Sequence, residues 1–205
     1  MTTVYLIRHS EILRVEEDPN TSEIVQLRNE KCPLSIHGEK IAEEFAANDE
    51  FKNLNEVWSS NYVRAMCTAK YFAHNNGIKV KIDDRLGERL QGITYWGELP
   101  EDYRQRQFED ETYKYGNGEN QIEVNKRMSE VFYDILSKNQ GKRVAIISHN
   151  TALTFLLRNW LKIYHNAPYT RDGKEVFDGH WNYLETFKLV FDENNNLQDI
   201  KNLRF

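Results

Sequence analysis

The sequence predicts an α/β fold with an open sheet that includes parallel strands. Two short segments, residues 4–7 and 144–147, consist of apolar residues that favour strands, which is typical of strands buried on both faces. Each segment runs into polar residues that include a histidine, His9 after the first and His149 after the second. Ligands bind beyond the carboxyl ends of the strands in an open α/β sheet. We therefore expect the two strand ends to contribute to one site.

The chain between these two strands begins with an irregular segment and then alternates between helical and strand patterns. Residues 11–33 are rich in charge and show no clear period, which predicts a long loop. Ser35 is a good N-cap for the helix that follows, because apolar residues then recur at helical spacing. Residues 56–58 form a short strand that leads into a helix over residues 62–74, and residues 79–82 alternate as a strand does.

The second half of the chain contains one segment of different composition. Residues 93–118 interleave aromatic side chains with charged and amide side chains. We interpret this segment as an insertion over the sheet edge that forms a partly helical lid, and a simple surface excursion is an equal alternative. Apolar periodicity predicts helices over residues 121–138 and 152–163. Two further strands are expected at residues 186–191 and 197–202, joined by a turn.

Composition limits the classes of partner. The chain has 205 residues, 40% of them hydrophobic and 29% charged, with a formal net charge of −5. This charge argues against general binding to nucleic acid or to anionic membrane surfaces. The sequence has no apolar stretch near the ~20 residues of a membrane span. Cys32 and Cys67 have no CxxC spacing and are expected to be free thiols, so we expect a cytoplasmic protein. Composition leaves the oligomeric state open.

Four junctions at the ends of strands carry residues suited to phosphate chemistry. They contribute the adjacent Arg8 and His9, then Arg64, Glu88 and His149. Guanidinium groups bind phosphate oxygens through two parallel hydrogen bonds, and a neutral imidazole can attack phosphorus. A carboxyl group can protonate the leaving oxygen and later accept a proton from water. The residues therefore predict a site for a small phosphorylated substrate.

A metal centre is the alternative interpretation of two histidines and Glu88. Metal-binding histidines commonly occur at HxxxH or HxH spacing, which the sequence lacks here. The two arginines would also repel a cation. We therefore expect no metal and no other cofactor.

Five motifs, in order along the chain, resemble those of the histidine phosphatase superfamily, the phosphoglycerate mutase-like group. They span nearly the whole sequence, and the ordered set is more specific than any single motif. The motifs are Arg8-His9 after the first strand, Leu34-Ser35 with Gly38 and Ala42, Ser59-Ser60 with Arg64-Ala65 and Thr68-Ala69, Glu88 with Gly92, and Ser148-His149.

The resemblance implies a single catalytic domain over residues 1–205, a three-layer α/β/α sandwich around a mostly parallel sheet. It also implies a covalent phosphohistidine on His9. In that scheme Arg8, Arg64 and His149 hold the phosphoryl oxygens, and Glu88 is the acid and base. The residues alone do not choose between His9 and His149 as the nucleophile; the family resemblance favours His9.

The sequence departs from the family pattern near the signature residues. Ser10 stands where the family usually has glycine, and Ile12 where it usually has threonine. An asparagine that often contacts phosphate is missing near Val15, and Asn150 replaces the glycine that commonly follows the late Ser-His pair. We include Ser10 and Asn150, with Arg8, Arg64 and His149, among the expected substrate-binding residues.

These observations favour a phosphomonoesterase that hydrolyses a small phosphorylated metabolite. A phosphoglycerate mutase is the alternative within the family, although the chain looks short for the family's cofactor-dependent mutases. A phosphate-binding regulatory protein with little turnover is the alternative from another class. The presence of all five signature residues argues against it.

Overall fold

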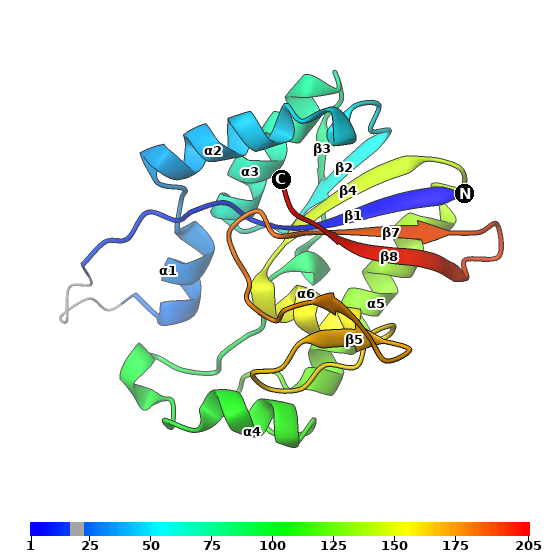
Figure 1. Cartoon of the computed structure of the whole chain (residues 1–205). Helices are drawn as coiled ribbons and strands as arrows, with labels where there is room; N and C mark the ends of the chain where they lie inside the picture. Colours follow the sequence, from blue (N-terminus) through cyan, green and yellow to red (C-terminus); the bar gives the residue numbers. More distant parts are fainter. Residues whose placement is uncertain (17–22) are drawn as a thin grey trace.

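The computed structural model describes residues 1–16 and 23–205, and among these residues six strands form one sheet in the order β3-β2-β4-β1-β7-β8 (Figure 1). β1, β2, β3 and β4 run parallel, whereas β7 is antiparallel to β1 and β8 is antiparallel to β7. The predicted mostly parallel sheet is confirmed. The strands are β1 (Thr2–Arg8), β2 (Glu56–Ser59), β3 (Val80–Ile82), β4 (Arg143–Ser148), β7 (Thr186–Phe191) and β8 (Leu197–Leu203).

Helices cover both faces of this sheet. α5 (Gln121–Ser137) and α6 (Asn150–Leu157) pack on one face, and α2 (Ile36–Ala46) and α3 (Val63–Asn75) pack on the other (Figure 1). Successive side chains of a strand point to opposite faces, so alternate residues of β1 enter the two apolar cores on either side. The predicted three-layer α/β/α arrangement is therefore confirmed.

Two of the expected elements differ from the structure. The loop expected over residues 11–33 contains the helix α1 (Val25–Lys31), and residues 17–22 of that loop lie outside the described residues. α1 lacks a side-chain cap, and its first residue is bonded through its backbone to Thr94 of a distant segment. Its position thus depends on tertiary contacts that a local pattern cannot reveal. The helix expected over residues 152–163 begins at Asn150 and ends at Leu157, because the apolar pattern continues into a turn that still packs in the core.

A small antiparallel hairpin lies outside the main sheet and was not predicted. It pairs β5 (Tyr169–Arg171) with β6 (Lys174–Phe177). The strands are too short, and too exposed in places, to give a clear alternating pattern. Three short 3-10 helices complete the regular structure of the described residues: η1 (Asp49–Phe51), η2 (Asp84–Leu86) and η3 (Trp96–Glu98).

The predicted insertion at residues 93–118 is partly helical. It contains η3 and the helix α4 (Tyr103–Glu109), which Figure 1 shows at the lower edge of the molecule. Phe108 of α4 packs against Phe155 of α6, with 6.0 Å between the ring centroids. The segment therefore belongs to the folded body, and its role as a lid stays a prediction.

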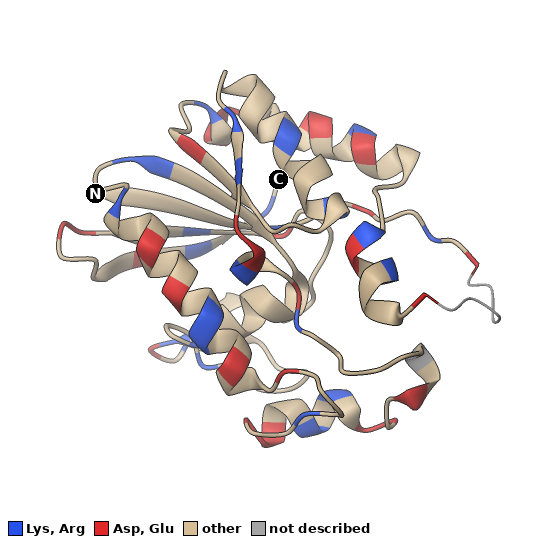
Figure 2. Ribbon diagram, turned by 180° about the vertical axis from the view of Figure 1, so that it is seen from behind, with Lys and Arg blue, Asp and Glu red and all other residues tan. Residues whose placement is uncertain are grey.

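Charged residues of both signs are interspersed on the surface. Figure 2 shows both acidic and basic positions along α5, the long helix at the lower left of that view. Within the described residues, no helix has the length and apolar character that a bilayer crossing requires.

Candidate active site

The ends of two neighbouring strands bring the two predicted histidines together. β1 and β4 are paired in parallel with Arg8 opposite Ser148, so the next residue of each strand end is a histidine. The imidazole rings of His9 and His149 lie 5.1 Å apart between centroids. His149 is also the N-cap residue of α6. The two histidines that follow strand ends in the sequence therefore lie side by side in the structure.

His9 is held as a neutral imidazole with a defined tautomer. Its ring is 6% exposed. Nδ1 donates to the carbonyl oxygen of Ser10 at 2.7 Å, and Nε2 accepts from Nε of Arg64 at 3.0 Å. Because a carbonyl only accepts and a guanidinium only donates, the proton is on Nδ1 and the lone pair is on Nε2. Burial lowers the pKa of His9 well below its usual value, and the charge of Arg64 lowers it further.

His149 is fully buried and has one free ring nitrogen. Its Nε2 is 2.7 Å from Oγ of Ser60, while Nδ1 has no hydrogen-bond partner among the described residues. The ring of Tyr62 lies 4.6 Å away between centroids. Burial lowers the pKa of His149 well below its usual value, with the charge of Arg64 as the next cause.

The two arginines are anchored by backbone carbonyls and aromatic rings. Arg64, in the first turn of α3, donates through Nη1 to the carbonyl oxygen of Asn29 in α1, and its guanidinium lies over the ring of Tyr62. Arg8 donates through Nη1 to the carbonyl oxygen of Trp181 at 3.0 Å. These contacts fix two planar cations beside the histidines, which suits the binding of phosphoryl oxygens.

Glu88 follows η2 in the chain, and its carboxylate lies at the N-terminus of α6. Its carboxylate accepts from the backbone N–H groups of Thr151 at 3.2 Å, Ala152 at 2.9 Å and Arg89 at 2.9 Å. Arg127 of α5 donates to the carbonyl oxygen of Gly87 at 2.9 Å, which holds the backbone that carries Glu88. The carboxyl group is therefore fixed in orientation at the start of α6, the helix that His149 caps, and its charge acts on Arg8 and Arg64.

Ser10 and Asn150 occupy different positions relative to this cluster. The hydroxyl of Ser10 donates to the carbonyl oxygen of Gly38 at 2.7 Å, and its N–H donates to Oγ1 of Thr68 at 3.0 Å. Ser10 thus positions the carbonyl that fixes the tautomer of His9. Asn150 begins α6 and lines a cavity beside the cluster. Substrate contact by either residue stays a prediction.

Sequence reasoning missed several side chains that complete the cluster. Ser60 follows the end of β2, so its position after a strand could have marked it as a candidate; its contact with His149 depends on β2 lying beside β4. Tyr183 had no such signal. Its ring lies 4.7 Å from the guanidinium of Arg8 and 6.1 Å between centroids from His9. The following residue, Leu184, has a φ of 61°, a backbone strain that the sequence does not reveal.

Because His9 and His149 are buried, we predict that the free energy of unfolding decreases in mild acid. Their pKa values lie below the value of ~6.5 expected in an unfolded chain, so the unfolded state binds more protons below that pH. The contribution of each neutral histidine to the free energy of unfolding is complete above pH ~6.5. Below that pH the free energy of unfolding decreases by up to about 1.4 kcal/mol per pH unit for each histidine. Urea denaturation at pH 7.0, 6.0 and 5.5 measures this slope.

The variant His9→Gln should show a shallower slope, because one of the two groups no longer titrates. His74→Gln is the matched control, since His74 is exposed at the end of α3. Parallel curves for the wild type and His9→Gln would contradict a depressed pKa at His9.

Known proteins resemble this chain in both sequence and structure. The sequence model of the histidine phosphatase superfamily (branch 1) matches residues 4–175. A protein named probable phosphoglycerate mutase GpmB from Escherichia fergusonii is 27% identical over 164 residues, which cover 77% of this chain and 74% of the relative.

Two solved structures share the fold. The mycobacterial glucosyl-3-phosphoglycerate phosphatase with inorganic phosphate aligns with a TM-score of 0.72 and 16% identity, covering 99% of this chain and 96% of its own. A mutant phosphoserine phosphatase from Entamoeba histolytica, in complex with phosphoserine, aligns with a TM-score of 0.67 and 18% identity. The alignment covers 98% of this chain and 97% of the phosphatase chain. The matched residues include the strand ends that carry Arg8, His9, Arg64, Glu88 and His149, and this chain belongs to the histidine phosphatase superfamily (branch 1).

Proposed function

We propose that this protein is a phosphomonoesterase that hydrolyses a small phosphorylated metabolite through a phosphohistidine on His9. The observation that carries the proposal is the neutral His9, whose Nε2 lone pair faces the guanidinium of Arg64. A nucleophile and a charge-stabilising donor are then in contact before any substrate binds. Such preorganised donors account for a large part of enzymatic rate enhancement.

The proposed reaction has two steps. Nε2 of His9 attacks phosphorus, and the P–O bond to the alcohol breaks while Glu88 protonates the departing oxygen. Water then attacks the phosphorus of the phosphohistidine and gives a proton to Glu88, and the P–Nε2 bond breaks, which releases phosphate and restores neutral His9. Arg8, Arg64 and His149 hold the phosphoryl oxygens throughout. The N–H of Arg64 that now points to His9 turns to a phosphoryl oxygen when substrate is bound.

Phosphoglycerate mutase activity is the second candidate. It is favoured by the names of curated relatives, which are probable phosphoglycerate mutases. The phosphatase is favoured by structural neighbours that act on phosphorylated metabolites, namely a phosphoserine phosphatase and a glucosyl-3-phosphoglycerate phosphatase. The reactions share the phosphoenzyme and differ in whether water or a second alcohol accepts the phosphoryl group.

We expect the purified protein to release inorganic phosphate from p-nitrophenyl phosphate and from members of a panel of phosphorylated metabolites, in the presence of EDTA. An acid-labile, base-stable label should appear on the protein after quenching with a radiolabelled substrate, as a phosphoramidate requires. Conversion of 3-phosphoglycerate to its 2-isomer without phosphate release would instead support the mutase. Absence of both reactions and of any label would refute the proposed function.

A further inference from the structure

A cavity of about 340 Å³ borders the catalytic cluster on the side of α4. Asn150 and Thr151, at the start of α6, form part of its wall, and Thr151 also donates its N–H to Glu88. Trp181 forms another part, and its carbonyl oxygen accepts from Arg8. The volume lies in the range of small-molecule sites. A group attached to a phosphoryl bound at His9 would therefore have this cavity beside it.

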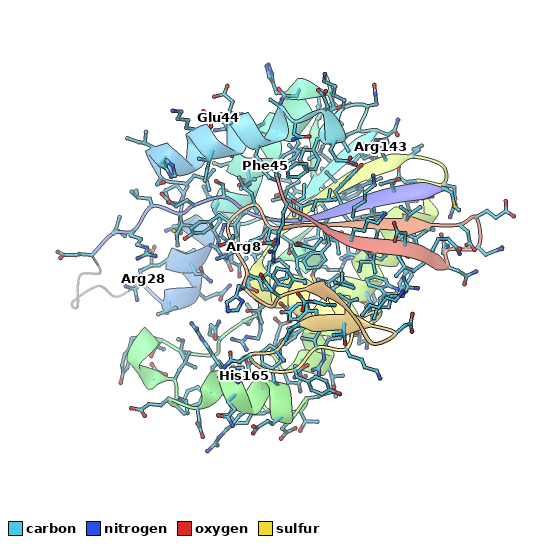
Figure 3. The ribbon with its side chains drawn as sticks, viewed as in Figure 1. Arg8, Arg28, Glu44, Phe45, Arg143 and His165 are labelled. Carbon is cyan, nitrogen blue, oxygen red and sulfur yellow. The ribbon has the colours of Figure 1, made fainter. Side chains whose placement is uncertain are left out.

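The wall of this cavity is positively charged. Arg89 and Arg104 carry the charge, His165 also lines the wall, and none of the described lining residues is acidic, although the chain has 32 acidic and 27 basic residues. Figure 3 shows His165 next to α4, which also carries Arg104. A second cavity, of about 300 Å³, also borders Glu88, and its lining is mixed, with Glu30 and Glu119 beside Arg85 and Arg127. An anion would therefore be attracted more strongly to the first cavity than to the second.

Arg89 is the unusual residue of the positive cavity. It is only 4% exposed, and it forms no ion pair among the described residues. Nη2 donates to Oε1 of Gln91 at 2.8 Å, and the guanidinium lies 4.9 Å from the centre of the Tyr103 ring. Nε and Nη1 are buried without a hydrogen-bond partner. Buried cations are normally paired, because an unpaired buried charge is strongly unfavourable.

A neighbouring cation, Arg104, lines the same cavity and is exposed. Burial is the largest cause that lowers the pKa of Arg89; Tyr103, Glu88 and Glu119 act in the opposite direction, and the charge of Arg104 lowers the pKa again. Arg104 and Gln107 come from α4, inside the insertion at residues 93–118. The insertion thus supplies part of the wall that would face the group carried by the phosphate.

We propose that this cavity binds the alcohol part of the substrate and that Arg89, assisted by Arg104, binds a second anionic group on it. This inference rests on the proposed function, because it assumes a phosphoryl group at His9. A carboxylate or a second phosphate supplies oxygens that match guanidinium donors and neutralises the unpaired charge. The substrate class is therefore a phosphomonoester that carries another acidic group, in preference to a neutral alcohol phosphate.

The test compares substrates that differ only at the far end of the molecule. The set is 3-phosphooxypropionate, its neutral amide and 1,3-propanediol bisphosphate, together with the five-carbon homologues of all three. The wild type should favour the acids over the amides in kcat/KM. The substrate with the higher kcat/KM, carboxylate or bisphosphate, identifies which anion the cavity prefers. Equal kcat/KM for acids and amides at both chain lengths would overturn the proposal.

The variant Arg89→Met should reduce the ratio of kcat/KM for the acids to kcat/KM for the amides by about 10- to 100-fold, the usual contribution of a hydrogen bond to a charged group. Arg104→Met, which changes an exposed side chain, should reduce it in the same direction by a smaller factor. Arg106→Met is the matched control, because Arg106 is on the same helix, pairs with Asp102, and does not line the cavity. It should leave the ratio unchanged. An unchanged ratio in both Arg89→Met and Arg104→Met would overturn the proposal.

Binding measurements separate this inference from the proposed function. Calorimetric titration of His9→Ala and His9→Ala/Arg89→Met with the acids and amides requires no turnover. Tighter binding of the acids, lost with Arg89, supports the subsite even if the wild type fails to hydrolyse any phosphomonoester. Equal binding of acids and amides by His9→Ala would overturn the subsite even if the wild type is an active phosphatase.

Discussion

Replacing His9 by alanine should lower phosphomonoester turnover by about 10⁴-fold or more, because the covalent intermediate can no longer form. The residue follows the end of β1, and its side chain contacts the catalytic cluster instead of either apolar core. The fold should therefore persist, and circular dichroism should be unchanged. Steady-state kcat and the amount of phosphoenzyme trapped by an alkaline quench measure the effect.

His74→Ala provides the matched control, since it removes an exposed imidazole far along α3 from Arg64. It should keep wild-type turnover. If His9→Ala kept near-normal turnover and still became labelled, His9 would not be the nucleophile, and His149 would be the next residue to test.

Replacing Glu88 by glutamine should affect alkyl phosphates far more than p-nitrophenyl phosphate. An alkoxide is a poor leaving group and needs a proton, whereas nitrophenolate is a stable anion. General acid catalysis contributes about 10²–10⁴-fold, so the loss on an alkyl phosphate should approach that range and the loss on the nitrophenyl ester should be much smaller. The glutamine keeps the shape of a side chain that the N–H groups of Thr151 and Ala152 hold in place.

The comparison must follow phosphoenzyme formation in a single turnover, because Glu88 also serves as the proposed base in the second step. Glu130→Gln, an exposed change on α5, should leave both substrates unaffected. Equal losses on the two substrates would mean that Glu88 orients the start of α6 and that the proton comes from another group.

Local sequence patterns were sufficient to predict the central strands and the residues at their ends. Arg8, His9 and His149 follow uninterrupted apolar segments, and parallel strands carry their ends to one edge, so adjacency in space could be expected before the sheet order was known. The helices α2, α3 and α5 were likewise predicted, because each has an apolar stripe at helical spacing.

Features that depend on distant contacts could not be predicted in this way. α1 is anchored through backbone bonds to Thr94 and through the Asn29 carbonyl to Arg64, neither of which leaves a periodic signal. The contact between Ser60 and His149 requires β2 to lie beside β4, which only the sheet order reveals. An arginine in the sequence suggests a solvent-exposed side chain, so the burial of Arg89 was also unexpected.

The pairing of Arg8 with Ser148 ties the assembly of the site to a long-range contact in folding. β1 and β4 are far apart in the sequence, and contacts between such distant segments form slowly. A register shift of one residue would turn every side chain of β1 to the other face and separate the two histidines. A nascent chain that ends before β4 would already contain His9, Arg64 and Glu88, yet it would lack His149, which holds a phosphoryl oxygen in the proposed reaction. The residues of the proposed reaction therefore come together only when β4 pairs with β1.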